Sequence, residues 1–285
     1  MPLLDPKIVR RAVKAALAED IGRGDVTTLA VVPLRHQARA VIRARQPMTV
    51  AGLALAESAF RLVSPRIKIR RRVRDGQSVR AGATLLEMSG PARAILSAER
   101  VALNFLQRLS GVATLTRRFV RAVRGTQAKI LDTRKTTPGW RAFEKYAVRC
   151  GGGWNHRSGL FDMVLIKDNH LASLRGARPN PVGAAVARAR RRFPELLIEV
   201  EADTLRQVRQ ALAAGADRIL LDNMSPARVR RAVRLAQGRA KLEVSGGVNL
   251  RTAPAFARTG VDFISVGALT HSAPAVDIGL DFEAP

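Results

Sequence analysis

The spacing of hydrophobic residues divides the chain into three regions. In the first, apolar residues recur at helical spacing up to Glu19, at Val9, Val13, Ala16 and Leu17. Asp5 and Pro6 provide a cap and a first turn, and Gly22 provides a stop, so this region predicts a helix. From about residue 34 to 96, apolar residues instead alternate with charged ones between glycine turns, as at Ile67 and Ile69. This pattern predicts strands.

Ser97 is expected to begin a second helix, whose apolar face carries Ala102, Phe105, Leu106 and Leu109. Beyond about residue 112, short apolar runs alternate with helical segments. The runs are 128–131, 163–166, 196–200, 218–221, 242–244 and 263–266, and the later helices are 182–193, 204–214, 225–236 and 251–258. Strands that alternate with helices indicate a parallel sheet, which six such units can close into a barrel or leave open.

A polar residue or a glycine follows each of the six apolar runs. These residues are Asp132-Thr133-Arg134-Lys135, Lys167-Asp168-Asn169, Glu201, Asp222-Asn223, Ser245-Gly246-Gly247 and Gly267. Polar residues begin many loops after strands, which explains one or two of these positions but not all six. Because α/β barrels carry their catalytic groups at the carboxyl ends of the strands, the pattern favours a barrel with an active site there.

The last two of these loops are candidate phosphate sites. Ser245-Gly246-Gly247 lies between a strand and a helix, and Gly267-Ala268 follows the last strand. Glycine allows backbone N–H groups to approach an anion closely, and a helix N-terminus adds partial positive charge. We therefore expect a phosphate group to bind at these two loops.

Charged residues at the other loops indicate a metal ion and an anionic substrate. Glu201 and Asp222 end adjacent strands and are candidate ligands for Mg²⁺, although two solvated or ion-paired acids would give the same pattern. The cationic set consists of Arg134, Lys135, His156, Arg157 and Lys167, with Gly151-Gly152-Gly153 just before the histidine. Arginine binds carboxylate or phosphate in a bidentate manner, so this set suits a polyanionic substrate.

Composition adds limits on location and partners. The formal net charge is +26, from 49 basic and 23 acidic residues, but the arginines are spread over the chain and aromatic residues make up only 4%. Binding to nucleic acid is therefore a minor alternative. The single cysteine, Cys150, excludes an intramolecular disulfide, and neither a signal peptide nor a membrane span is recognisable. We expect a cytoplasmic protein.

Longer motifs resemble the quinolinate phosphoribosyltransferase family, in order and spacing over nearly the whole chain. They are Glu19–Thr28, Ala98–Leu106, Asp132–Gly139, Cys150–Arg157, Lys167–His170, Leu221–Met224, Glu243–Val248 and Ser265–His271. The resemblance implies an α/β protein with an N-terminal α+β sandwich domain at 1–111 and an incomplete barrel of about six strand–helix units at 112–271. The tail, 272–285, would pack back on the first domain.

The resemblance also implies an activity and an assembly. The chain would transfer a phosphoribosyl group from phosphoribosyl pyrophosphate to quinolinate, with loss of carbon dioxide, to give nicotinate mononucleotide for NAD biosynthesis. Each barrel mouth would be closed by the neighbour in a homodimer, with higher assembly open, and Arg100 would reach the partner's substrate across the interface. Neither a membrane nor nucleic acid is expected as a partner.

Roles for single residues follow from the same resemblance. Quinolinate and pyrophosphate would be surrounded by Thr133, Arg134, Lys135, His156, Arg157 and Lys167. Glu201 and Asp222 would face the ribose and Mg²⁺, and together with Lys135 and Lys167 they form the expected catalytic set. Ser245, Gly246, Gly247, Gly267 and Ala268 would bind the 5′-phosphate.

Two alternatives remain at this point. A paralogue associated with molybdate-transport operons shares the fold but has an unsettled substrate; the complete cationic set and Arg100 argue against it. A basic nucleic-acid-binding protein on a barrel scaffold is the other, and its binding would depend steeply on salt.

Overall fold

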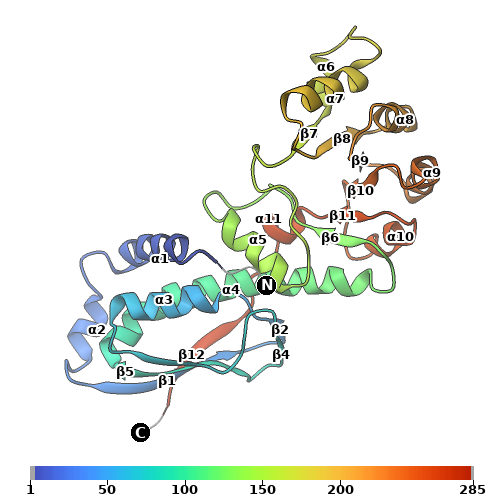
Figure 1. Cartoon of the computed structure of the whole chain (residues 1–285). Helices are drawn as coiled ribbons and strands as arrows, with labels where there is room; N and C mark the ends of the chain where they lie inside the picture. Colours follow the sequence, from blue (N-terminus) through green and yellow to red (C-terminus); the bar gives the residue numbers. More distant parts are fainter. Residues whose placement is uncertain (1–3, 284–285) are drawn as a thin grey trace. The chain divides into compact units, whose positions relative to one another are not determined.

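The computed structural model describes residues 4–283, and the chain forms two compact units (Figure 1). The first unit contains residues 1–117, 142–152 and 272–285, and the second contains residues 118–141 and 153–271. The boundary expected between residues 111 and 112 falls inside a 31-residue helix, α4 (Ala92–Ala122). This helix begins at Ala92 rather than at the expected Ser97, because the end of the preceding strand leads directly into it.

The N-terminal helix of the first unit forms as its sequence predicts. α1 (Pro6–Ile21) begins after Asp5, whose carboxylate accepts a hydrogen bond from the backbone N–H of Lys7 at 2.8 Å, and Gly22 ends it. The short α2 (Val26–Val31) follows and is capped by Asp25 in the same manner. Both helices thus start at an aspartate that satisfies a backbone donor left free by the helix geometry.

A four-stranded antiparallel sheet forms the centre of the first unit. Its order is β12 (Ile278–Phe282), β1 (Gln37–Ala44), β5 (Thr84–Pro91) and β3 (Lys68–Arg71), and β2 (Met48–Thr49) pairs separately with β4 (Ser78–Val79). Helices α3 (Leu53–Val63) and α4 lie over one face of this sheet (Figure 1), and α5 (Arg141–Cys150) also falls almost wholly within this unit. The sequence did not predict α3, because its apolar residues lie within a region dominated by strand alternation.

The second unit is a parallel sheet of six strands. Their order is β6 (Lys129–Leu131), β11 (Phe263–Ser265), β10 (Lys241–Ser245), β9 (Arg218–Asp222), β8 (Ile198–Ala202) and β7 (Val164–Ile166). The strands form an arc with α7 (Pro181–Arg192), α8 (Leu205–Ala213), α9 (Pro226–Ala236) and α10 (Ala253–Ala257) on its outer side (Figure 1). Two short helices, α6 (Asp168–Ala172) and α11 (Ala268–His271), follow β7 and β11. The six expected strands and the α/β fold class are therefore confirmed.

The register of these strands separates apolar from polar side chains. Ile198, Val200 and Ala202 of β8 are buried on the face that the helices cover, so Glu199 and Glu201 point to the opposite, inner face. Arg218 pairs with Glu199, and Leu220 pairs with Glu201, so β9 presents Arg218 on the inner face as well. Charged residues thus occupy a layer that bulky aliphatic residues usually fill in α/β barrels.

Within residues 4–283, no helix is both long enough and apolar enough to cross a membrane.

Candidate active site

A cleft of about 650 Å³ opens at the carboxyl ends of the strands in the second unit. Most of the predicted site residues line it: Thr133, Arg134, Lys135, His156, Arg157, Lys167, Glu201, Asp222, Ser245 and Gly246. Gly247, Gly267 and Ala268 lie outside the lining, although a Cβ added to Gly267 would stand 3.1 Å from the Lys135 side chain. Arg100 is exposed on α4 in the first unit. Ten of the predicted site residues therefore converge on one cleft.

Positive charge dominates one part of the cleft. Arg134, Lys135, Arg157 and Lys167 all contribute to its lining. Burial, and then the neighbouring charge of Arg134, lower the pKa of the Arg157 guanidinium. Two guanidinium groups that repel each other in a partly buried site are stabilised when an anion binds between them. The arrangement therefore suits a ligand with more than one negative charge.

Hydrogen bonds to β6 hold the segment that carries His156 and Arg157. The backbone N–H of Trp154 donates to the carbonyl of Ile130 at 2.8 Å, and the N–H of Asp132 donates to the carbonyl of Trp154 at 3.1 Å. The buried carboxylate of Asp132 then accepts a hydrogen bond from the backbone N–H of His156 at 2.9 Å. Residues 154–156 are thereby fixed against β6.

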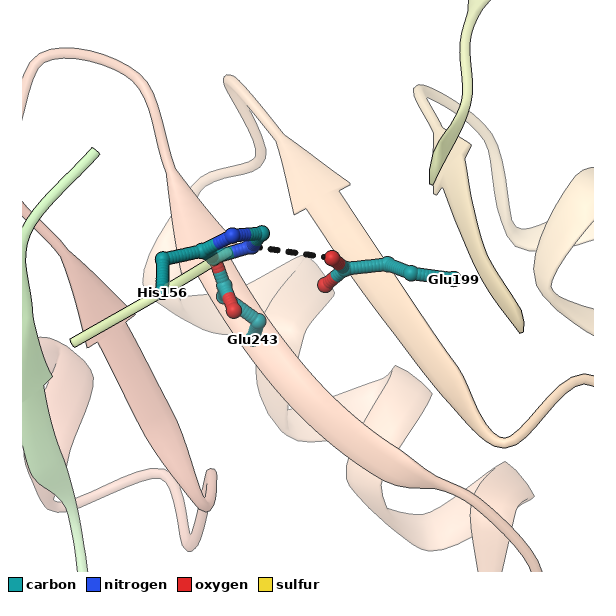
Figure 2. Close-up of side chains that lie close together, drawn as sticks. All are labelled: His156, Glu199 and Glu243. Atoms are coloured by element: carbon teal, nitrogen blue, oxygen red, sulfur yellow. Dashed lines mark hydrogen bonds and ion pairs between the residues drawn. The ribbon is translucent and has the colours of Figure 1, made fainter. Parts of the chain in front are cut away.

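Both ring nitrogens of His156 are engaged, as Figure 2 shows for one of them. Nε2 lies 2.9 Å from Oε2 of Glu199 and 3.5 Å from Oε1 of Glu243. Nδ1 accepts a hydrogen bond from the backbone N–H of Arg157 at 2.7 Å. Because an accepting nitrogen uses its lone pair, the proton of a neutral ring is on Nε2 and points to Glu199.

Glu199 and Glu243 form a carboxyl pair with no exposed surface. Burial raises the pKa of each to about 7; the positive charge of Arg218 opposes this at Glu199, and the charge of Glu199 adds to it at Glu243. Nη1 of Arg218 lies 3.1 Å from Oε2 of Glu243, and its Nε lies 4.0 Å from Oε1 of Glu199. With one arginine for two buried carboxyls, the charged form of both groups together is unfavourable, which is the direction of both pKa shifts.

The sequence analysis assigned no role to Glu199, Glu243 or Arg218. A signal was present in the strand alternation: Ile198-Glu-Val-Glu-Ala202 and Leu242-Glu-Val244 place glutamates on the side opposite to buried aliphatic residues. In a parallel sheet covered on both faces, such positions are normally apolar.

Among the described residues, His156, Glu199 and Glu243 are the one group of three whose donor atoms lie close enough to hold a metal, within 4.8 Å of one another. Arg218, however, already contacts both carboxylates and supplies the compensating charge. A divalent cation at this position would add a second centre of positive charge next to the guanidinium. We therefore interpret the group as a hydrogen-bonded network rather than a metal centre.

Glu201 and Asp222 are better placed for a divalent cation. They end the neighbouring strands β8 and β9 on the same face, and both line the cleft. Burial raises the pKa of Glu201, Lys167 opposes this, and the charge of Asp222 adds to it. Nζ of Lys167 lies 3.7 Å from Oε2 of Glu201. Two carboxylates that repel each other at the rim of a cleft fit the oxygen ligands that Mg²⁺ takes.

Gly246 lines the cleft, and the backbone of Gly247 follows it. Gly246 and Gly247 have φ angles of +90° and +62°, which are readily adopted only by glycine. Within residues 4–283, the N–H groups of Gly246, Gly247, Gly267 and Ala268 donate no hydrogen bond. α10 begins at Ala253, close to the expected start at residue 251, and a turn at 249–252 separates it from Gly247. Any phosphate affinity at this loop therefore comes from its own amides.

Cys150 is buried in the first unit, and burial raises the pKa of its thiol to about 12. A thiol in this state is neither a nucleophile nor a metal ligand at neutral pH. Cys150 therefore packs as a small buried hydrophobic residue.

Comparison with known proteins gives a consistent result over the whole chain. The family model for the N-terminal domain of quinolinate phosphoribosyl transferase matches residues 25–110, and the model for its C-terminal domain matches residues 112–281. A probable nicotinate-nucleotide pyrophosphorylase (carboxylating) of Bacillus subtilis is 45% identical over 264 residues, which cover 92% of this chain and 89% of the relative. A nicotinate-nucleotide pyrophosphorylase (carboxylating) of Mycobacterium leprae is 45% identical over 95% of this chain and 96% of its own length.

A solved structure agrees as well. The nicotinate-nucleotide pyrophosphorylase from Francisella tularensis superimposes with a TM-score of 0.93 at 41% identity, and the match covers 99% of this chain and 98% of that one. The sequence motifs, the fold and the cleft residues thus all indicate the same family. The chain belongs to the quinolinate phosphoribosyltransferase family.

Proposed function

We propose that this chain catalyses the decarboxylating transfer of a phosphoribosyl group from phosphoribosyl pyrophosphate to quinolinate, which gives nicotinate mononucleotide, pyrophosphate and carbon dioxide. The observation that carries the proposal is the composition of the cleft: cationic side chains, a pair of carboxylates at adjacent strand ends, and Ser245 and Gly246 of the glycine loop line one cavity. A substrate pair with two carboxylates, a pyrophosphate and a ribose phosphate requires all three kinds of group.

Each group has a task in this reaction. Arg134 and Arg157 bind the carboxylates of quinolinate, and Lys135 and Lys167 compensate the charge that develops on the departing pyrophosphate. The amides of Gly246, Gly247, Gly267 and Ala268, with the Ser245 hydroxyl, bind the 5′-phosphate. Glu201 and Asp222 face the ribose and hold Mg²⁺, which supplies additional charge stabilisation for pyrophosphate.

The chemistry follows from these positions. The ring nitrogen of quinolinate attacks C1 of the ribose while the bond from C1 to pyrophosphate breaks. The ring nitrogen becomes cationic, so the electron pair released when the adjacent carboxylate leaves as carbon dioxide is stabilised by the ring itself. A proton then adds to that carbon. Positioning and electrostatics supply the acceleration, and no separate cofactor is needed as an electron sink.

The site is completed by a second copy of the chain. The partner subunit's Arg100 reaches the quinolinate carboxylates across a homodimer interface. Two observations support this: Arg100 is exposed on α4, and the surrounding Ala98–Leu106 segment resembles the helix that carries this role in the family. The lone buried cysteine suits the reducing cytoplasm, where we place the reaction.

The test is an assay that contains quinolinate, phosphoribosyl pyrophosphate and Mg²⁺, with nicotinate mononucleotide and carbon dioxide followed together. We expect both products in equal amounts and only when both substrates are present. Product from nicotinate instead of quinolinate, without carbon dioxide, would contradict the proposed substrate. No product from folded protein would favour the paralogue that acts on a different aromatic acid.

A further inference from the structure

The buried network below the cleft has no place in the reaction described above. Glu199, Arg218 and Glu243 project from the adjacent strands β8, β9 and β10 onto the inner face of the sheet. Both glutamate side chains are fully buried. His156 and Glu243 are nevertheless among the residues that border the cleft. Among residues 4–283, Oε1 of Glu199 and Oε1 of Glu243 have no hydrogen-bond partner. An apolar layer would fill this space at a lower cost in desolvation.

The geometry around His156 indicates what the network does. The ring is held at Nε2 by Glu199 and at Nδ1 by the backbone N–H of Arg157, and its own backbone N–H is held by Asp132. Neither nitrogen is directed to a ligand in this arrangement. His156 therefore acts on the cleft through Arg157, whose N–H it accepts.

We propose that Glu199 and Glu243, balanced by Arg218, are positioning residues that keep His156 in the neutral Nε2–H tautomer, and that its Nδ1 thereby fixes the backbone of Arg157 and directs this guanidinium into the cleft. The identity of the ligand that Arg157 meets, an aromatic dicarboxylate, rests on the proposed function. The position and the tautomer of the His156 ring do not depend on the proposed function.

The contacts connect Glu199 to the backbone of Arg157 through the ring of His156. The carboxylate of Glu199 accepts the Nε2 proton, and Glu243 at 3.5 Å favours the same proton position. The opposite tautomer would place a proton on Nδ1, directly against the N–H of Arg157 at 2.7 Å. Arg157 is held a second time, because its Nη1 donates to the carbonyl of Met163 at 3.2 Å. A guanidinium fixed at its backbone and at one nitrogen has little freedom left to lose when an anion binds.

The tautomer can be measured without substrate. The chain has four histidines, so ¹⁵N-histidine labelling of the whole protein gives few ring signals, and His156→Gln identifies the signals of His156. We expect the ¹⁵N shifts of a ring with the proton on Nε2 and none on Nδ1, because Nδ1 accepts the N–H of Arg157. Glu199→Gln retains an oxygen acceptor and should keep this tautomer, whereas Glu199→Leu should release it. An Nδ1–H tautomer or a charged ring in the unmodified protein would overturn the proposal.

Affinity for quinolinate provides the second readout. The oxygen of Asn lies near the position of Nδ1 and can accept the Arg157 N–H, whereas the Gln amide lies near Nε2 and cannot. We expect His156→Gln to raise the dissociation constant for quinolinate by roughly tenfold or more, since a buried donor loses its partner, with a smaller rise for His156→Asn. The KM for phosphoribosyl pyrophosphate should change by less than about threefold in both variants.

The outcomes distinguish the positioning role of His156 from the proposed function. Equal losses in His156→Asn and His156→Gln, or parallel losses for both substrates together with a lower melting temperature, would indicate a merely structural role and contradict the positioning claim. If the unmodified protein binds no quinolinate, the proposed function fails, and the NMR result still decides the state of the ring.

Discussion

Asn223 occupies the space that a side chain at Gly246 would need: an added Cβ there would lie 2.1 Å from Oδ1 of Asn223. The amide of Asn223 also donates to the carboxylate of Asp222 at 2.6 Å. The glycine loop and the carboxylate at the end of β9 are therefore coupled through one asparagine, which itself adopts a positive φ of 50°.

Gly246→Ala should consequently weaken binding of the phosphoribosyl donor more than it weakens the fold. The new Cβ displaces Asn223 and strains a backbone with a φ of +90°. We expect the KM for phosphoribosyl pyrophosphate to rise by tenfold or more, on the order of 1.4 kcal/mol. Gly238→Ala is the matched control, because Gly238 has a φ of +76° but no atom within 4 Å of the added Cβ. It should cost about 1 kcal/mol of stability and leave KM unchanged. Equal KM values in the two variants would remove the crowding argument.

Replacement of either carboxylate at the strand ends should alter the response to Mg²⁺. Glu201→Gln or Asp222→Asn removes one charged oxygen ligand, so the Mg²⁺ concentration at half-maximal activity should rise by about ten- to a hundredfold. Binding of Mn²⁺ in the presence of phosphoribosyl pyrophosphate, measured by electron paramagnetic resonance, checks this without turnover. Asp203→Asn is the control, since Asp203 is exposed, follows the same strand and does not line the cleft. An unchanged Mg²⁺ response in both cleft variants would assign these acids to the ribose alone.

The shared site predicts complementation between inactive variants. Arg100→Ala should fold and dimerise but lose most activity, because a cationic contact to a carboxylate is lost. Mixed dimers with Lys135→Ala should regain part of the activity, since one of their two sites contains both intact residues. Arg121→Ala is the control on the same helix, where Arg121 is also exposed. Confirmed mixed dimers without activity would contradict a site shared across subunits.

The carboxyl pair should make stability depend on pH in a specific direction. The pKa of Glu243 in the folded protein is about 7, above the value of about 4.3 for an unfolded chain. The folded state therefore binds more protons between these values, and stability falls as the pH rises through this window. Glu243→Gln resembles the protonated form, so its stability relative to the unmodified protein should improve by roughly 1–3 kcal/mol from pH 5 to pH 8. Urea unfolding at both pH values measures this, and a pH-independent difference would mean that the pair is not titrating there.

The sequence predicted the second unit well because two kinds of information coincided there. Each strand was marked by an apolar run, and five of the six runs were followed by residues that line the cleft, such as Lys167 and Asp222. It predicted less of the first unit. α3 is buried along much of its length, so its pattern resembles that of the strands around it, and α4 follows β5 directly, so no loop marks its start at Ala92.

The buried network was missed for a different reason. Sequence patterns reveal which residues follow a strand, but Glu199 and Glu243 lie inside strands, where a charged side chain is ordinarily assigned to solvent. Their partnership with His156 also depends on contacts between residues 43 and 87 positions apart in the chain. Such a relationship becomes visible only when the strands are arranged side by side.

The pairing of β12 with β1 has a consequence for synthesis on the ribosome. β1 is made early, but the strand that covers one of its sides comes after all six strands of the second unit. Throughout most of translation, the nascent chain therefore carries an uncovered strand edge with the apolar run Ala40-Val-Ile42, a surface on which chains can associate with one another. β12 closes that edge, so we expect slow docking of Ile278–Phe282 to lower the yield of soluble protein without a change in the activity of the molecules that fold.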